Sequence, residues 1–271
     1  LMSVLENSFM HSERRNSHIR FLYSKGSMYK AMNGNLLFHG CIPLDEEGRL
    51  QSVTIAGADY SGKALLDKLD EIANRAYFMQ PGAEKDYAAD YMWYLWSGAR
   101  SPLYGKDKMA FFERYFLEDK ELQKENYNAY YHYSEQAEVC GRILEMFGLD
   151  PEKGHIINGH VPVKIKNGEK PVKAGGRLFV IDGGISKAYQ KATGIAGYTL
   201  IYDSHSLNLA EHRPFIAGES EHTPEIQLVE RLDRRANISD TDKGAELLEQ
   251  INDLRELLRA YRSGEIKESG R

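Results

Sequence analysis

Two histidines follow short apolar segments that share one design. His39 stands in the run N-L-L-F-H-G (residues 35–40), and His160 stands in I-I-N-G-H-V-P-V (residues 156–163). A strand that stops at a glycine and presents a histidine at its carboxyl end commonly places a metal ligand or an acid/base group. A proline lies close behind each histidine, and this matching design favours a shared role over two unrelated core histidines. Neutral imidazoles suit a divalent transition metal such as manganese, iron or zinc.

Two cations stand in polar stretches that can meet a substrate. Arg100 lies in S-G-A-R-S-P-L-Y-G-K (residues 97–106), a loop rich in Gly, Ser and Pro. Its guanidinium suits bidentate phosphate binding, although a solvated surface loop is the alternative. Lys173 lies in a lysine- and glycine-containing stretch, residues 164–176, which is either a substrate loop or a solvated excursion. We take Arg100 as the first phosphate-binding candidate and Lys173 as the second.

The composition narrows the class of protein. The chain has 271 residues, a formal net charge of -5 and a pI near 6.0, so it carries no overall basic footprint for nucleic acid. No apolar run approaches the roughly 20 residues that cross a bilayer, and no signal-peptide pattern is present. Cys41 and Cys140 do not form a disulfide framework, so a reducing cytoplasm is the expected compartment.

The elements that must position these residues alternate irregularly between helix and strand, which predicts a mixed α/β fold. Residues 2–32 read as one helix that stops at Asn33-Gly34, and residues 84–96 carry five aromatic rings that we expect to be buried. A strand at residues 178–181 ends in Asp-Gly-Gly, and residues 194–203 and 207–215 read as a hairpin.

The last quarter of the chain differs in character. Residues 1–216 are expected to belong to one catalytic domain, and residues 217–271 to a charged linker followed by an amphipathic helix. In that helix, residues 242–262, apolar side chains recur at steps of four and three. We expect this stripe to dock on its own domain, because two to three heptads are short for a coiled coil.

Several of these strings resemble a known superfamily. F-H-G-C-I-P (residues 38–43) resembles the middle histidine motif of the calcineurin-like metallophosphoesterases, and N-G-H-V-P-V (158–163) is similar to their last one. L-W-S (95–97) resembles a segment of the serine/threonine phosphatase branch. Longer strings resemble the class III fructose-1,6-bisphosphatases found mainly in Firmicutes: F-L-Y-S-K-G-S-M-Y (21–29), S-P-L-Y-G-K-D-K-M (101–109) and I-D-G-G-I-S-K-A-Y-Q (181–190).

The resemblance implies a two-metal phosphatase, usually manganese-dependent, that hydrolyses fructose 1,6-bisphosphate to fructose 6-phosphate and phosphate in gluconeogenesis. His39 and His160 would ligate the same metal. The fold would be the metallophosphoesterase sandwich, of which this chain supplies about one sheet with peripheral helices. The motifs D-x-H, G-D-x-x-D-R-G and G-N-H-[DE], which should precede His39, are absent from the chain.

Because proteins of that family are much longer, we interpret this chain as their carboxyl-terminal part. It would need the amino-terminal part of the same protein to complete its metal site, and we expect little activity from it alone. Missing partner strands would leave an open sheet edge, which favours self-association into a homo-oligomer. Two alternatives stay open: a non-catalytic assembly or regulatory module, and a metallophosphatase that acts on a different phosphoester.

Overall fold

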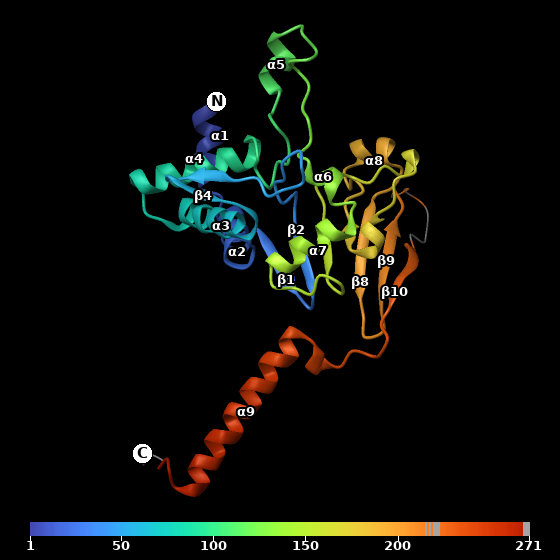
Figure 1. Cartoon of the computed structure of the whole chain (residues 1–271). Coiled ribbons are helices and arrows are strands. Elements are labelled where there is room, and N and C mark those ends of the chain that lie inside the picture. Colours follow the sequence, from blue (N-terminus) through green and yellow to red (C-terminus); the bar gives the residue numbers. More distant parts are fainter. Residues whose placement is uncertain (215, 217, 219–222, 268–271) are drawn as a thin grey trace.

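The computed structural model describes residues 1–214, 216, 218 and 223–267, which form three sheets flanked by helices (Figure 1). In chain order the elements are α1 (Met2–Met10), α2 (Glu13–Lys25), β1 (Tyr29–Met32), β2 (Asn35–Phe38), β3 (Val53–Ile55), β4 (Ala58–Tyr60), α3 (Gly62–Phe78), α4 (Ala83–Ser97), α5 (Phe111–Phe116), α6 (Tyr130–Tyr133), α7 (Ala137–Met146), β5 (His155–Asn158), η1 (Ile165–Asn167), β6 (Val172–Lys173), η2 (Ala174–Gly176), β7 (Leu178–Val180), α8 (Lys187–Thr193), β8 (Gly197–Tyr202), β9 (Ser206–His212), β10 (Glu225–Arg231), η3 (Ile238–Asp240) and α9 (Asp242–Ser263). The chain is therefore a mixed α/β protein, as its sequence predicts.

The central sheet has five strands in the order β1-β2-β5-β7-β6. Strands β2, β5 and β7 run parallel, while β1 and β6 are antiparallel edge strands. All four residues of β5 are buried, as is usual for a parallel strand with both faces covered. Because parallel strands end at the same edge of a sheet, the loops after β2, β5 and β7 begin side by side.

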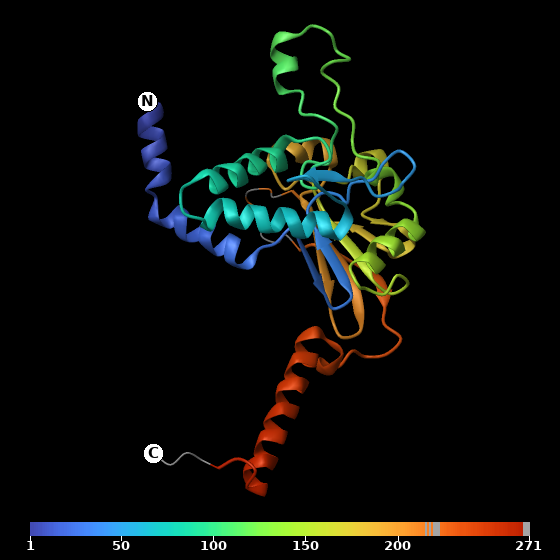
Figure 2. The same cartoon turned by 60° about the vertical axis from the view of Figure 1, so that its left-hand side comes forward.

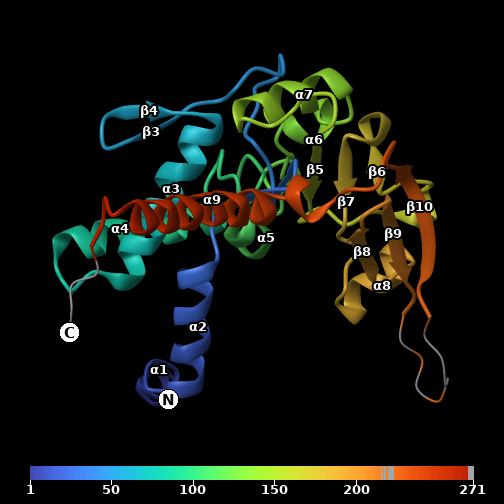
Figure 3. The same ribbon diagram turned by 90° about the horizontal axis from the view of Figure 1, so that it is seen from below.

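Both faces of this sheet are covered. On one face, α7 packs its apolar stripe (Val139, Ile143, Leu144) against alternate strand residues (Leu36, Ile156, Leu178). On the other face, Leu207 of β9 packs with Ile157 and Phe179. Strand β9 is the middle strand of a second, three-stranded sheet in the order β10-β9-β8. This second sheet and the helix pair α3–α4 lie at opposite ends of the molecule, with the central sheet between them (Figures 1 and 3).

The predicted helix over residues 2–32 is wrong, because the segment divides into α1, α2 and β1. The side chain of Ser12 accepts a hydrogen bond from the backbone N–H of Arg15 and caps a new helix there. Gly26 ends that helix, and Tyr29–Met32 pairs with β2 as an edge strand. Neither α1 nor α2 has a buried residue, so their apolar positions form no part of the core.

The aromatic residues of α4 are not all buried, contrary to expectation. Only Ala88 and Leu95 of this helix are fully buried, against α3. Trp93 is 64% exposed and Trp96 is 58% exposed, because both rings lie on faces that no described element covers.

The carboxyl-terminal quarter contains more structure than its charge predicts. The hairpin is confirmed as β8 and β9, although Phe215 lies outside the described residues. The predicted linker contains a strand, β10, which pairs with β9, and the expected boundary at Ala217 also lies outside the described residues. The amphipathic helix is confirmed as α9, but it does not dock on the body of the chain and extends away from it (Figures 1 and 2).

Candidate metal and phosphate site

His39 and His160 lie next to each other at the carboxyl ends of β2 and β5. His39 follows Phe38, the last residue of β2, and His160 follows β5 after one glycine. Their ring centroids are 4.9 Å apart, and the rings meet edge to face with an angle of 69° between their planes. The parallel pairing of the two strands therefore brings together residues that are 121 positions apart in the sequence.

The protonation of His160 follows from its hydrogen bonds. Its Nε2 lies 2.8 Å from the backbone oxygen of Tyr104, which can only accept, so Nε2 carries the proton. In this tautomer Nδ1 of His160 accepts the hydrogen bond that Nε2 of His39 donates at 3.0 Å, so Nδ1 is the nitrogen that would bind a metal once that proton is displaced. Such a carbonyl partner fixes the tautomer and ring orientation of a metal-binding histidine.

Several contacts hold the two histidine segments together. The backbone N–H of Gly159 donates to the carbonyl of His39 at 3.0 Å. The side-chain amide Nδ2 of Asn158 donates to the carbonyl of Gly40 at 3.2 Å and to the hydroxyl of Tyr130 at 3.0 Å.

His160 itself has a φ of 66°, a left-handed conformation that is strained for a residue with a side chain. Strain of this kind persists where the surroundings determine the conformation, and it often marks a functional position.

The surroundings favour neutral imidazole at His39. Although part of the ring is exposed, its burial against neighbouring groups lowers the pKa of His39, and the imidazole of His160 acts in the same direction. The carboxylate of Asp182, which follows β7, partly opposes this effect. A neutral imidazole has the free lone pair that a metal requires.

The donor pair fits one metal ion but does not form a complete site. Nε2 of His39 and Nδ1 of His160 lie 3.0 Å apart, so both side chains are close enough to hold one divalent ion together, and imidazole is a common metal ligand. Within residues 1–214, 216, 218 and 223–267, however, no three His, Cys, Asp or Glu residues are grouped so that they could hold a metal ion. The chain thus offers two ligands of a larger set.

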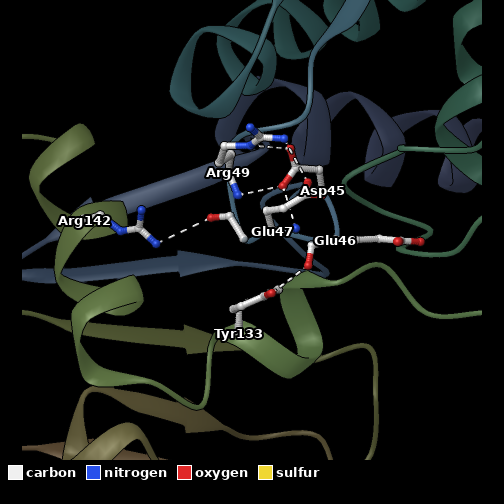
Figure 4. A network of polar contacts seen from close by, with 7 residues as sticks. Asp45, Glu46, Glu47, Arg49, Tyr133 and Arg142 are labelled. Atoms are coloured by element: carbon white, nitrogen blue, oxygen red, sulfur yellow. Dashed lines mark hydrogen bonds and ion pairs between the residues drawn. The ribbon is translucent and has the colours of Figure 1, made fainter.

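The segment after His39 is fixed by a polar network (Figure 4). The carboxylate of Asp45 accepts from the backbone N–H groups of Glu47 and Arg49 and from the Arg49 guanidinium. The backbone amide of Arg49 is the main reason that the pKa of Asp45 lies below its usual value. The hydroxyl of Tyr133 in α6 donates to the carbonyl of Glu46 at 2.6 Å. The bonds to Asp45 stabilise the turn that follows Pro43, and the bond from Tyr133 attaches this turn to α6.

The structure does not bring Arg100 and Lys173 into the cavity that His39 lines. Arg100 lines a separate cavity of about 550 Å³, where its guanidinium donates to the carbonyl of Ser52 at 3.2 Å. The ammonium of Lys173 pairs with Glu135 at 2.6 Å and lines a cavity of about 210 Å³. The loop that contains Arg100 nevertheless contributes to the histidine pair, because Tyr104 belongs to it.

Two lysines that the sequence analysis did not single out lie nearer. Lys25, at the end of α2, and Lys30, in β1, line the same cavity of about 530 Å³ as His39. In the described part of the chain neither ammonium has an ion-pair partner. The cavity is otherwise largely apolar, with Leu37 and Ile157 in its wall. The position of these lysines beside His39 could not be predicted, because both lie in the segment that was predicted as one long helix.

The chain is similar to known proteins over almost its whole length. The sequence profile of the Firmicute fructose-1,6-bisphosphatase family matches residues 1–263. The fructose-1,6-bisphosphatase class 3 of Clostridium botulinum strain Langeland is 52% identical over 275 residues, an alignment that covers 99% of this chain and 41% of that protein. The corresponding protein of strain Alaska E43 is also 52% identical, with 42% of its length covered.

This chain thus spans about two fifths of the length of the curated relatives that it matches. No solved structure matches it. The resemblance to the class III fructose-1,6-bisphosphatases, read from the longer strings, is confirmed by both comparisons. The chain belongs to the Firmicute fructose-1,6-bisphosphatase family.

Proposed function

We propose that this chain supplies two imidazole ligands, His39 and His160, to the metal centre of a fructose-1,6-bisphosphatase. The observation that carries the proposal is the 3.0 Å separation between Nε2 of His39 and Nδ1 of His160, at adjacent carboxyl ends of parallel strands. The remaining ligands would come from another part of a longer protein, since the relatives extend well beyond the matched region. The complete protein would hydrolyse fructose 1,6-bisphosphate to fructose 6-phosphate and phosphate.

The fold that we propose for the complete protein is the calcineurin-like sandwich. Two features support it: the histidines follow parallel strands of one sheet, and a second sheet packs on the face of the first through Leu207. Strands outside this chain would extend the layers. The largely apolar cavity beside His39 is a suitable surface for such strands, because Leu37 and Ile157 line it.

A divalent metal pair held at this site would polarise the phosphoryl oxygens and activate a water for hydrolysis. His160 would hold the metal through Nδ1, because the hydrogen bond from Nε2 to the carbonyl of Tyr104 fixes its tautomer. Manganese is the metal that we propose, because the resemblance to the class III fructose-1,6-bisphosphatases implies it and because carboxylate ligands from the rest of the protein would suit it. Lys25 and Lys30 line the His39 cavity and are our additional candidates for phosphate binding, beside Arg100 and Lys173.

The proposed compartment is the reducing cytoplasm. Cys41 and Cys140 are both free and buried, and burial raises the pKa of both thiols, so neither is set up to form a disulfide. Among the described residues, no helix is both long enough and apolar enough to cross a membrane.

The test compares this chain with the longer protein that contains it. Phosphate release from fructose 1,6-bisphosphate is measured with manganese present, and manganese binding is measured by calorimetry. We expect activity and tight metal binding only in the longer protein. His39→Ala or His160→Ala in that protein should abolish both, while His205→Ala, a histidine in the β8–β9 turn, should leave both unchanged.

The outcomes separate the alternatives. Activity toward another phosphoester but not toward the sugar bisphosphate would move the protein to a different substrate. Tight metal binding without hydrolysis of any phosphoester would favour the regulatory module. Full activity of this chain alone would refute the proposal, because its own residues would then complete the metal site.

A further inference from the structure

The loop that follows α4 contacts both histidine segments through two backbone oxygens. The carbonyl of Tyr104 accepts a hydrogen bond from Nε2 of His160 at 2.8 Å. The carbonyl of Pro102 accepts one from the backbone N–H of Cys41, two residues after His39, at 2.8 Å. A carbonyl group orients an imidazole only as firmly as its own peptide is held, so the residue that holds this loop also matters for the histidines.

Ser101 holds the loop with its side chain. It is completely buried, and its hydroxyl donates to the carbonyl of Leu95 in α4 at 2.6 Å. The same oxygen accepts from the backbone N–H groups of Leu103 and Tyr104, each at 3.3 Å. A serine hydroxyl has one donor hydrogen and two lone pairs, so these three bonds satisfy it fully. Its partners are thereby fixed, because moving any one of them would leave a buried polar group unpaired.

The backbone of Ser101 fixes the direction of the Tyr104 carbonyl. The N–H of Gly105 donates to the carbonyl of Ser101 at 2.9 Å. This N–H and the carbonyl of Tyr104 belong to one planar trans peptide, in which the two groups point in opposite directions. The bond to Ser101 therefore turns the oxygen of Tyr104 away from Ser101, to the side where His160 lies. Gly105 has a φ of 64°, which glycine adopts without strain.

A second serine nearby separates the closing of a helix from the positioning of a histidine. Ser97, the last residue of α4, donates its hydroxyl to the carbonyl of Trp93 at 3.0 Å. Like Ser101, it thus satisfies a carbonyl near the end of this helix. Within the part of the chain that the structure describes, its hydroxyl has no hydrogen bond to Leu103 or Tyr104. Ser97 is therefore the matched control for Ser101.

We propose that Ser101 is a positioning residue for His160. Its hydroxyl and its carbonyl hold the peptides on the two sides of Tyr104. The oxygen of Tyr104 in turn keeps the proton of His160 on Nε2 and leaves Nδ1 as the nitrogen that faces His39. The consequence for a metal rests on the proposed function, in which Nδ1 of His160 is a ligand.

The first test measures the tautomer of His160 in this chain without metal. Heteronuclear NMR of the ring nitrogens at about pH 8, where an ordinary histidine is mostly neutral, gives the ratio of the Nε2–H form to the Nδ1–H form. Ser101→Ala should lower this ratio by about 10-fold, since one hydrogen bond of ordinary net strength corresponds to a ratio of that size. Ser97→Ala should leave the ratio unchanged.

An unchanged ratio in a folded Ser101→Ala chain would overturn the proposal, because Ser101 would then serve only to close the end of α4. Circular dichroism checks that the variant is folded. If the substitution prevents folding, amide hydrogen exchange of the wild-type chain decides the matter. The N–H groups of Tyr104 and Gly105 should be protected, and rapid exchange of both would show that Ser101 does not hold them.

The second test measures manganese binding to the longer protein by calorimetry. Ser101→Ala should weaken binding by about 10-fold or more, the usual effect of removing a group that orients a metal-binding histidine, and Ser97→Ala should not weaken it. An unchanged affinity would overturn the role of Ser101 toward the metal. A wild-type longer protein that binds no manganese would instead refute the proposed metal centre, while the tautomer ratio in this chain would still decide whether Ser101 positions His160.

Discussion

Removal of a single buried hydroxyl, that of Tyr130, tests how the histidine segments are held. Tyr130 is fully buried in the main core, and its hydroxyl accepts a hydrogen bond from Nδ2 of Asn158 at 3.0 Å. Asn158 is itself 3% exposed and directly precedes Gly159 and His160. Tyr130→Phe keeps the ring and its edge-to-face contact with Phe38 but leaves one N–H of Asn158 without an acceptor.

The expected loss of stability is about 1–3 kcal/mol, the desolvation cost of a buried donor left unpaired. The neighbouring tyrosine provides the matched control. The hydroxyl of Tyr131 is also buried but has no hydrogen-bond partner among the described residues. Tyr131→Phe removes a buried hydroxyl that makes no compensating hydrogen bond, so the free energy of unfolding should change by less than about 0.5 kcal/mol or should increase.

Urea unfolding followed by circular dichroism measures both free energies of unfolding, with the slope against denaturant as a check that the denatured states are comparable. Equal effects of the two substitutions would refute the reasoning, because burial of the hydroxyl would then matter and its partner would not. A loss below about 0.5 kcal/mol in Tyr130→Phe would likewise mean that Asn158 finds another acceptor at no cost.

Three further predictions concern single positions. Gly40→Ala would place a Cβ 2.4 Å from the backbone oxygen of Pro102, so urea unfolding should show a loss of about 1–3 kcal/mol. Arg100 has a φ of 65°, a left-handed conformation that glycine adopts without strain, so Arg100→Gly should leave the free energy of unfolding unchanged or raise it by up to about 1 kcal/mol. If Arg100 binds a substrate phosphate, the same substitution should raise the KM of the longer protein. Burial acts to raise the pKa of Glu125, but hydrogen bonds from Lys106 and from the backbone of the α5 arm (residues 106–127) hold it below its usual value. The stability that ionised Glu125 gives the arm is therefore fully present above the ordinary pKa of glutamate and is lost as the pH falls through the lowered pKa of Glu125. Limited proteolysis of the arm should increase over that pH range.

The histidine pair could be predicted because its signal is local. Each histidine follows a short apolar run and a turn residue, and the parallel strand pairing that joins them is the usual arrangement for such runs. For the loop of residues 97–106 the sequence analysis proposed a contact through the side chain of Arg100, which lies in a separate cavity. The structure uses the backbone oxygen of Tyr104 instead, and a carbonyl group leaves no trace in residue type.

The lysines beside His39 could not be predicted, for a different reason. Their position depends on β1 pairing with β2, and the mildly apolar periodicity of residues 2–32 concealed the break at Gly26. The exposed rings of α4 were missed because aromatic content predicts burial only when another element is available to cover the helix. Both errors concern tertiary contacts, which outweigh local propensity.

The geometry of the histidine pair bears on how the proposed complete site would assemble. This chain holds two imidazole nitrogens 3.0 Å apart through its own contacts, including the strained backbone of His160. If these nitrogens ligate the proposed metal, the ion would meet two of its ligands already arranged, and the remaining ligands would come from the rest of the longer protein. Under this proposal, manganese should tighten the association of this chain with the separately produced remainder of the longer protein. Linkage requires that the remainder tighten manganese binding to this chain by the same factor. Calorimetry on the two halves measures both factors, and unequal values would show that the two segments do not share one metal site.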